Sequence, residues 1–263
     1  MTRWHGGVLT AATLAVLVTG CASARVGLPT GEGDAFLSYA DAWADATAAC
    51  RAVTSLSAEL SISGRAGPER LHGRVAAGVA RPSGLRLEGV APFGPPAFIL
   101  VVDESGATLL LPRDHRVLIG AAPSDVLEAL VGLPLGPGDL LALVTGCVAP
   151  DSKPQSGRRF ADGWATVGLD DGATLYLRQD RRGRWSVRAG VRPPLTINYD
   201  RAGSDPPTVL HVRSRDSNLQ IGLAQVEINV AFPRDVFRVK VPADAVQMTL
   251  ADLRQAGPMG QRR

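Results

Sequence analysis

The stretch that decides the fold is LRLEGVAPFGPPAFILVVDESGATLLLPRDHRVLIGAAPSDVLEALVGLPLGPGDLLALVTGC, residues 85–147. It begins with a strand in which Leu85 and Leu87 alternate with charged residues, and it turns at the proline-flanked apolar tip 92–96. Further strands are expected at 98–102, 107–111 and 115–119, and short helices at 124–131 and 139–145. The stretch is more apolar than a strand with one solvated face requires. We therefore interpret it as the wall and the plug of a cavity for an apolar molecule.

The run Phe98–Val102 is apolar at every position, which is typical of a strand that is buried on both faces. An antiparallel sheet needs cover on both sides of such a strand, and the two helices just downstream are the natural cover. Gly136 and Pro137 begin the second helix and Gly146 ends it. Both helices are too short to be stable alone, so packing must hold them.

Alternating strands dominate the rest of the chain. Leu56, Leu60 and Ile62 alternate with serines and a glutamate. In the last long strand the apolar residues move from one set of alternating positions to the other at Ala224 and Gln225, which indicates a β-bulge. A helix is expected from Asp34 to about Cys50. With about ten or eleven strands and no βαβ rhythm, the prediction is a mainly β fold: one strongly curved antiparallel sheet, an unclosed half-barrel with a helical lid. It would form one domain, residues 34–256, before a polar tail at 257–263.

The N-terminus indicates export. Arg3 and His5 precede an apolar segment, and small residues lead to Cys21, a pattern typical of a lipoprotein signal peptide at residues 1–20. Cys21 would be the lipidated first residue of a flexible tether, residues 21–33. An ordinary cleavage site or a membrane anchor are the alternatives. Ala22 would direct a Gram-negative lipoprotein to the outer membrane, with its domain facing the periplasm.

Two other cysteines, Cys50 and Cys147, follow Cys21 in the chain. In an exported chain they are candidates for a disulfide, which would close a loop of about 97 residues and contribute roughly 4–5 kcal/mol on the chain-entropy model. Two buried free thiols are the alternative.

Composition and motifs give no sign of catalysis. The chain has 28 basic and 25 acidic residues, a balance that argues against nucleic-acid binding. No histidine has metal-ligand spacing, and neither a Gly-x-Ser-x-Gly motif nor a phosphate-binding loop is present. The arginine run 181–184 is typical of a solvated turn. We expect a protein that is not an enzyme and that uses no metal and no cofactor.

The order of these features resembles the LolA/LolB-like fold of bacterial lipoprotein-localisation factors, and more closely its lipidated LolB-like branch. The resemblance runs from about Leu56 to Val144. It rests on a strand, the tip Ala91–Gly94, two further strands, and two helices joined by residues 132–135. A C-terminal stretch, residues 237–244, also resembles lipoproteins of this type. The second half matches only in its strand pattern.

The resemblance implies an unclosed barrel whose apolar cavity receives the acyl chains of lipoproteins. The lipidated member accepts its cargo from a soluble periplasmic carrier, and a protruding apolar residue after the third strand helps insertion into the membrane. Phe93 matches that position, although Pro95 and Pro96 depart from the pattern. An ordinary packed turn aromatic is the alternative for Phe93.

The leading hypothesis is therefore a monomeric, lipid-anchored binder of acyl chains, with a lipid or an acylated lipoprotein as its partner. The expected cavity-lining residues are Ile99, Val101, Leu109, Leu111, Leu127, Leu130, Leu140 and Leu143. The alternative is an envelope assembly or scaffolding lipoprotein whose half-barrel binds a protein. A lipid hydrolase has less support, because it would need a serine and a histidine within reach of each other.

Overall fold

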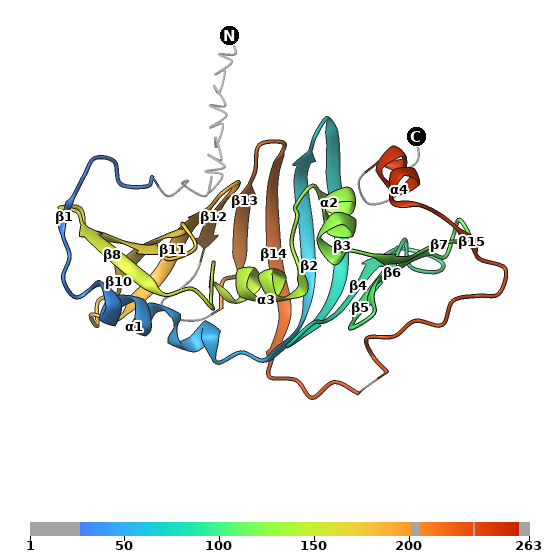
Figure 1. Ribbon diagram of the computed structural model, residues 1–263, viewed down its shortest axis with the longest axis horizontal. Helices are drawn as coiled ribbons and strands as arrows, with labels where there is room; N and C mark the ends of the chain where they lie inside the picture. Colours follow the sequence, from blue (N-terminus) through green and yellow to red (C-terminus); the bar gives the residue numbers. More distant parts are fainter. Residues whose placement is uncertain (1–26, 201–205, 234, 258–263) are drawn as a thin grey trace, which may run out of the picture.

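The computed structural model describes residues 27–200, 206–233 and 235–257. The expected signal peptide 1–20, Cys21 and most of the tail 257–263 lie outside these residues. Within them the chain forms one mixed but almost wholly antiparallel sheet of 15 strands, which runs from β1 at one edge to β15 at the other (Figure 1). The two edges do not pair with each other, so the barrel is open. The predicted fold class is confirmed.

The strands lie in the sheet in the order β1-β8-β9-β10-β11-β12-β13-β14-β2-β3-β4-β5-β6-β7-β15. Their bounds are β1 Asp34–Ala35, β2 Ser55–Ala66, β3 Glu69–Ala80, β4 Gly84–Val90, β5 Ile99–Asp103, β6 Gly106–Leu111, β7 Arg116–Ala121, β8 Pro154–Arg159, β9 Trp164–Leu169, β10 Thr174–Gln179, β11 Trp185–Arg192, β12 Leu195–Asp200, β13 Val209–Arg213, β14 Ser217–Ile228 and β15 Val246–Gln247. The helices are α1 Tyr39–Arg51, α2 Pro123–Val131, α3 Pro137–Thr145 and α4 Leu250–Ala256.

The number of strands exceeds the expected ten or eleven because short segments that were expected to be loop or helix pair as strands. Residues 154–157, expected to be loop, begin β8, which pairs with β9 despite its polar sequence. Asp34 does not cap a helix, because Asp34 and Ala35 pair with β8 as the edge strand β1. The helix α1 consequently begins at Tyr39. The expected bulge in β14 is present, with a register shift after Ala224 and a positive φ at Gln225.

Two halves of the sheet meet where β14 pairs with β2. This pairing joins residues 151 to 172 positions apart, such as Leu219 with Gly64 and Ile221 with Ile62. A side chain at Gly64 has no room, because a Cβ there would lie 2.2 Å from the carbonyl oxygen of Asn218, and φ is +136°. We call the β14–β2 pairing the seam. Strands β8–β14 lie on one side of it and β2–β7 on the other.

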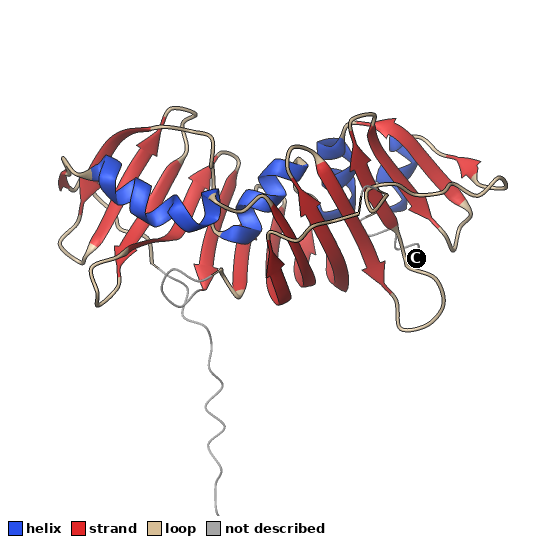
Figure 2. Cartoon of the chain, turned by 90° about the horizontal axis from the view of Figure 1, so that it is seen from below, coloured by secondary structure: helices blue, strands red, loops and turns tan. Residues whose placement is uncertain are grey.

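The helices lie along one face of the sheet, in the trough made by its curvature (Figure 2). α1 packs on β8, β9 and β11, and α3 packs on β3 and α1. α2 contacts β6 and α4. In Figure 1, α2 and α3 lie over the central strands on either side of the seam. We call α2, the connection 132–136 and α3 the lid.

The opposite face of β3 and β4 is covered by the chain that follows β14. Phe232 lies over Gly78 and Phe237 over Gly84, with the two rings 5.4 Å apart. Arg86 donates hydrogen bonds to the carbonyl oxygens of Val236 and Arg238, at 2.9 and 3.0 Å. This segment carries the chain back to α4, which packs against α2 and so supports the lid.

Candidate functional site

A small apolar cavity lies between the central strands and the lid. Every residue that lines it is apolar, and its volume is about 40 Å³. The lining residues are Leu60, Ile62, Val75, Leu87, Phe98, Leu127, Leu130, Val131, Leu133, Leu135, Leu140, Leu219 and Ile221. An ordered water needs roughly 10–15 Å³ and polar partners, so the cavity is large enough for water but offers it no hydrogen bond. It is suited only to apolar groups.

The cavity is far smaller than an acyl chain in this closed conformation. Pockets that enclose drug-sized ligands have volumes of about 300–1,000 Å³. A guest chain must therefore displace part of the lid, because the floor is a hydrogen-bonded sheet. The lid consists of two helices of nine residues each and a short connection.

Three of the predicted lining residues, Leu127, Leu130 and Leu140, line the cavity. Leu109, Leu111 and Leu143 are buried in the same core cluster but do not reach it. Ile99 and Val101 are placed on the wrong face by the prediction, since Leu100 and Val102 point into the core and neighbouring strand residues point to opposite sides.

The floor of the cavity, which the sheet strands form, is not among the lining residues expected from the sequence. Leu60 and Ile62 on β2, and Leu219 and Ile221 on β14, line the cavity from the two sides of the seam, where Ile62 and Ile221 are direct partners. The alternation around Leu60 and Ile62 was a usable signal for one inward face. The partner strand β14 was not foreseeable from local pattern.

α3 is fixed at both of its ends. Its Asp139 forms an ion pair with Arg192 of β11, and the hydrogen bond to Asp139 raises the pKa of that guanidinium. Asp139 also accepts a hydrogen bond from the Gly136 amide, at 3.0 Å. Just after α3, Cys147 forms a disulfide with Cys50 of α1, with the Cα atoms 5.8 Å apart. The predicted disulfide is therefore present, and it ties α3 to α1.

The apolar tip protrudes from the sheet. The Phe93 side chain is 88% exposed, so it is not the packed turn aromatic that was the alternative. Arg113, from the turn between β6 and β7, donates to the carbonyl oxygens of Phe93 and Pro95, at 2.8 and 3.2 Å. The neighbouring turn thus holds the tip in position. Its role in membrane insertion stays a prediction.

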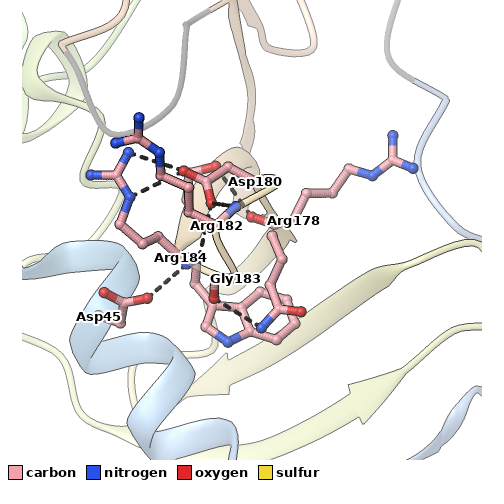
Figure 3. Close-up of polar contacts among 9 residues, drawn as sticks. Asp45, Arg178, Asp180, Arg182, Gly183 and Arg184 are labelled. Carbon is pink, nitrogen blue, oxygen red and sulfur yellow. Dashed lines mark hydrogen bonds and ion pairs between the residues drawn. The ribbon is translucent and has the colours of Figure 1, made fainter.

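The arginine run after β10 is an ordered turn (Figure 3). The Asp180 carboxylate accepts hydrogen bonds from the amides of Arg182 and Arg184, at 2.8 and 3.0 Å, and pairs with the Arg184 guanidinium. These contacts, chiefly the Arg184 amide, lower the pKa of Asp180. Asp45 of α1 accepts a hydrogen bond from the Trp185 amide at 2.7 Å. The turn therefore fastens β11 to α1, which is a structural role.

The remaining polar groups do not gather into a recognisable centre. His115 lies 3.1 Å from Asp244 and His211 lies 3.5 Å from Asp200, each pair at the surface or half-exposed. Among the described residues, no three histidine, cysteine, aspartate or glutamate side chains come together as metal ligands would. None of the helices in the described ranges has the length and apolar character needed to span a bilayer.

Comparison with known proteins finds similarity in structure alone. No protein-family model and no curated protein sequence matches the chain. A LolA superfamily protein from Nitrosomonas europaea superposes with a TM-score of 0.51 at 12% identity, covering 75% of this chain and 97% of its own. The chain has a LolA-like fold. A DUF1329 family protein from Desulfovibrio piger gives a TM-score of 0.51 at 10% identity, over 78% of this chain and 98% of its own.

The expected fold is thus confirmed, and the LolB-like branch stays a prediction. At these identities the likeness concerns the arrangement of strands and helices. The features of this chain that bear on function are its lid and its cavity.

Proposed function

We propose that the protein is a lipid-anchored binder of acyl chains in the cell envelope, without enzymatic activity. The observation that carries the proposal is the wholly apolar cavity beneath a short-helix lid. Sheltering an acyl chain there would remove several hundred Å² of apolar surface from water, at about 25 cal/mol per Å². The lid must move for this to happen, which also makes binding reversible.

The anchor and the location belong to the same proposal. Cys21 would carry the lipid, residues 21–33 would be the tether, and residues 34–256 the binding domain. The sequence around Cys21 and Ala22 supports an outer-membrane location. The proposal further takes a soluble periplasmic carrier as the donor of an acylated lipoprotein and a monomer as the acting form. A LolB-like role, insertion of lipoproteins into that membrane, is the finer form of this proposal.

Native mass spectrometry of the chain from Ala22 onward tests the binding function. We expect a mass of co-purified or added single-chain lipid on the unaltered protein, and its loss in Leu140→Glu, which places a charge in the cavity wall. Leu37→Glu, at a side chain that is 92% exposed, is the matched control. Absence of lipid from the unaltered protein under gentle extraction would contradict the proposal.

A second candidate function is a scaffolding lipoprotein that binds a protein partner. The small volume of the closed cavity favours it, as does the exposed Phe93 on a tip held by Arg113. This candidate predicts a core that never opens. Lipid binding by the unaltered protein would exclude that prediction.

A further inference from the structure

A surface crevice of about 560 Å³ adjoins the lid. It lies among the ends of the β2–β3 and β13–β14 hairpins, the end of α2 and the end of α4. The residues that define it include Gly67, Glu128, Gly132, Pro134, Arg215 and Arg254. It is therefore lined by both charged groups and apolar surface, unlike the cavity beneath the lid.

The connection between α2 and α3 separates the crevice from the cavity. Gly132 and Pro134 line the crevice, whereas Leu133 and Leu135 line the cavity. A single segment of the chain therefore separates the crevice from the cavity. Gly132 ends α2 with φ +71°, and its carbonyl oxygen accepts a hydrogen bond from the Ser217 hydroxyl, at 3.1 Å.

The two helices of the lid are held unequally. α3 is fixed by the Cys50–Cys147 disulfide and by the ion pair of Asp139 with Arg192. The α2 side has the Ser217 hydrogen bond and an ion pair of Glu128 with Arg254 at 3.8 Å, in which both side chains are about half exposed. Exposed pairs of this kind contribute roughly 0–1 kcal/mol. α2 also packs against α4 and β6, but it has no covalent tie. Because the disulfide holds α3, we expect α2 and the connection to be displaced more readily than α3.

We propose that the crevice is the entrance of the acyl site and the resting place of the ligand's polar head. α2 and residues 132–136 move outward while α3 stays attached to α1 and β11. The acyl chain then passes between the connection and the β13–β14 turn into the apolar cavity. The ligand class is a single-chain lipid or an acylated peptide, whose polar head remains among the charged groups of the crevice. This inference rests on the acyl-binding function proposed above.

An engineered disulfide can close the entrance. A Cβ atom at Gly132 would lie 3.6 Å from the Cβ of Ser217, within the range of about 3.5–4.5 Å that disulfides require. We use the Gly132→Cys, Ser217→Cys double variant in the chain from Ala22, which retains every described element. The probe is lysophosphatidylcholine with an environment-sensitive fluorophore on its acyl chain. Oxidation is expected to slow probe uptake at least tenfold, and reduction to restore it.

A crosslink away from the entrance is the matched control. A Cβ at Gly222 would lie 3.9 Å from the Cβ of Ser61, its partner across the seam on the face away from the cavity. The Ser61→Cys, Gly222→Cys variant is expected to take up the probe equally fast in both redox states. It also controls for reduction of Cys50–Cys147, and each single Gly132 and Ser217 variant controls for strain. Equal uptake by the oxidised and reduced entrance variant would overturn the proposal.

Hydrogen exchange of the unaltered protein gives a readout that needs no ligand. Amides of 127–131 in α2 are expected to exchange at least tenfold faster than amides of 141–145 in α3. If α3 exchanges as fast as α2, the proposed entrance is wrong, whatever binds. If α2 exchanges faster but the probe does not bind to the unaltered protein, the acyl-binding function is the part that fails.

Discussion

Phe93 illustrates how neighbouring residues can hold an apolar side chain in water. The Arg113 guanidinium bonds two carbonyl oxygens of the tip, and Gly94 supplies a φ of +76° that favours glycine. Beneath the tip, the Gly89 amide donates to the Phe98 carbonyl oxygen, at 3.0 Å, and extends the β4–β5 pairing. The tip is therefore presented by ordered structure on both sides.

Replacing Phe93 by glutamate tests its contact with membranes. We expect the free energy of unfolding of the Phe93→Glu variant to lie within about 0.5 kcal/mol of that of the unaltered protein, as is usual for substitutions at exposed positions. The variant should bind phospholipid vesicles several-fold more weakly. Vesicle flotation of the chain from Ala22 measures binding. Leu37→Glu, at an equally exposed leucine far along the chain, should not weaken it. Equal losses in both variants would remove the specific role of Phe93.

The lid residue Leu130 tests whether the cavity accepts a guest. Leu130→Ala should lower the free energy of unfolding by about 2–5 kcal/mol, because Leu130 is 1% exposed and its removal enlarges the cavity. Leu118→Ala, equally buried but outside the cavity lining, should cost a similar amount. Thermal melts with an added long-chain fatty acid should rescue Leu130→Ala more than Leu118→Ala. Equal rescue would contradict a guest in this cavity.

At the scale of elements, the lid depends on covalent and ionic ties more than on helix propensity. Helices of nine residues are not stable alone in water, so α2 and α3 persist through packing and anchorage. α3 buries nearly all of its apolar side chains, from Leu140 to Val144. The disulfide extends this anchorage to α1.

Removing the disulfide should loosen α1 and α3 more than α2. The Cys50→Ser, Cys147→Ser double variant is expected to lose roughly 2–5 kcal/mol of unfolding free energy in denaturant titrations. Hydrogen exchange should accelerate in α1 and α3 more than in α2, which has no tie to either cysteine. Reductant should leave the unfolding of this variant unchanged while destabilising the unaltered protein. An unchanged exchange rate in α3 would mean that the ion pair of Asp139 with Arg192 suffices to hold the helix.

At the scale of the whole molecule, the seam between β14 and β2 decides whether the two halves form one sheet. Both strands have 12 residues and are paired along most of their length. The floor of the cavity comes from both sides of this pairing, so a cavity exists only when the halves are joined.

A glycine at the seam provides the test. Gly64→Ala should cost more than about 2 kcal/mol, since its Cβ would clash with the Asn218 carbonyl oxygen at a φ that is unfavourable for alanine. Gly138→Ala is the control, because a Cβ there meets no atom within 4 Å and φ is not positive. Chemical denaturation measures both. A Gly64→Ala protein as stable as the control would show that the seam tolerates a shift.

The sequence by itself determined the β class, both lid helices, the bulge near Gln225 and the cysteine pair. These follow from local signals: alternation along a strand, glycine and proline at helix ends, and two spare cysteines in an exported chain. Only the tertiary structure decided that β14 lies beside β2, which face of β5 is inward, and how little space remains beneath the lid. Residues 151 to 172 positions apart pair through the shape of the whole sheet, and the volume of a cavity depends on how side chains from several elements interlock. No local sequence pattern specifies the pairing of β14 with β2 or the volume of the cavity.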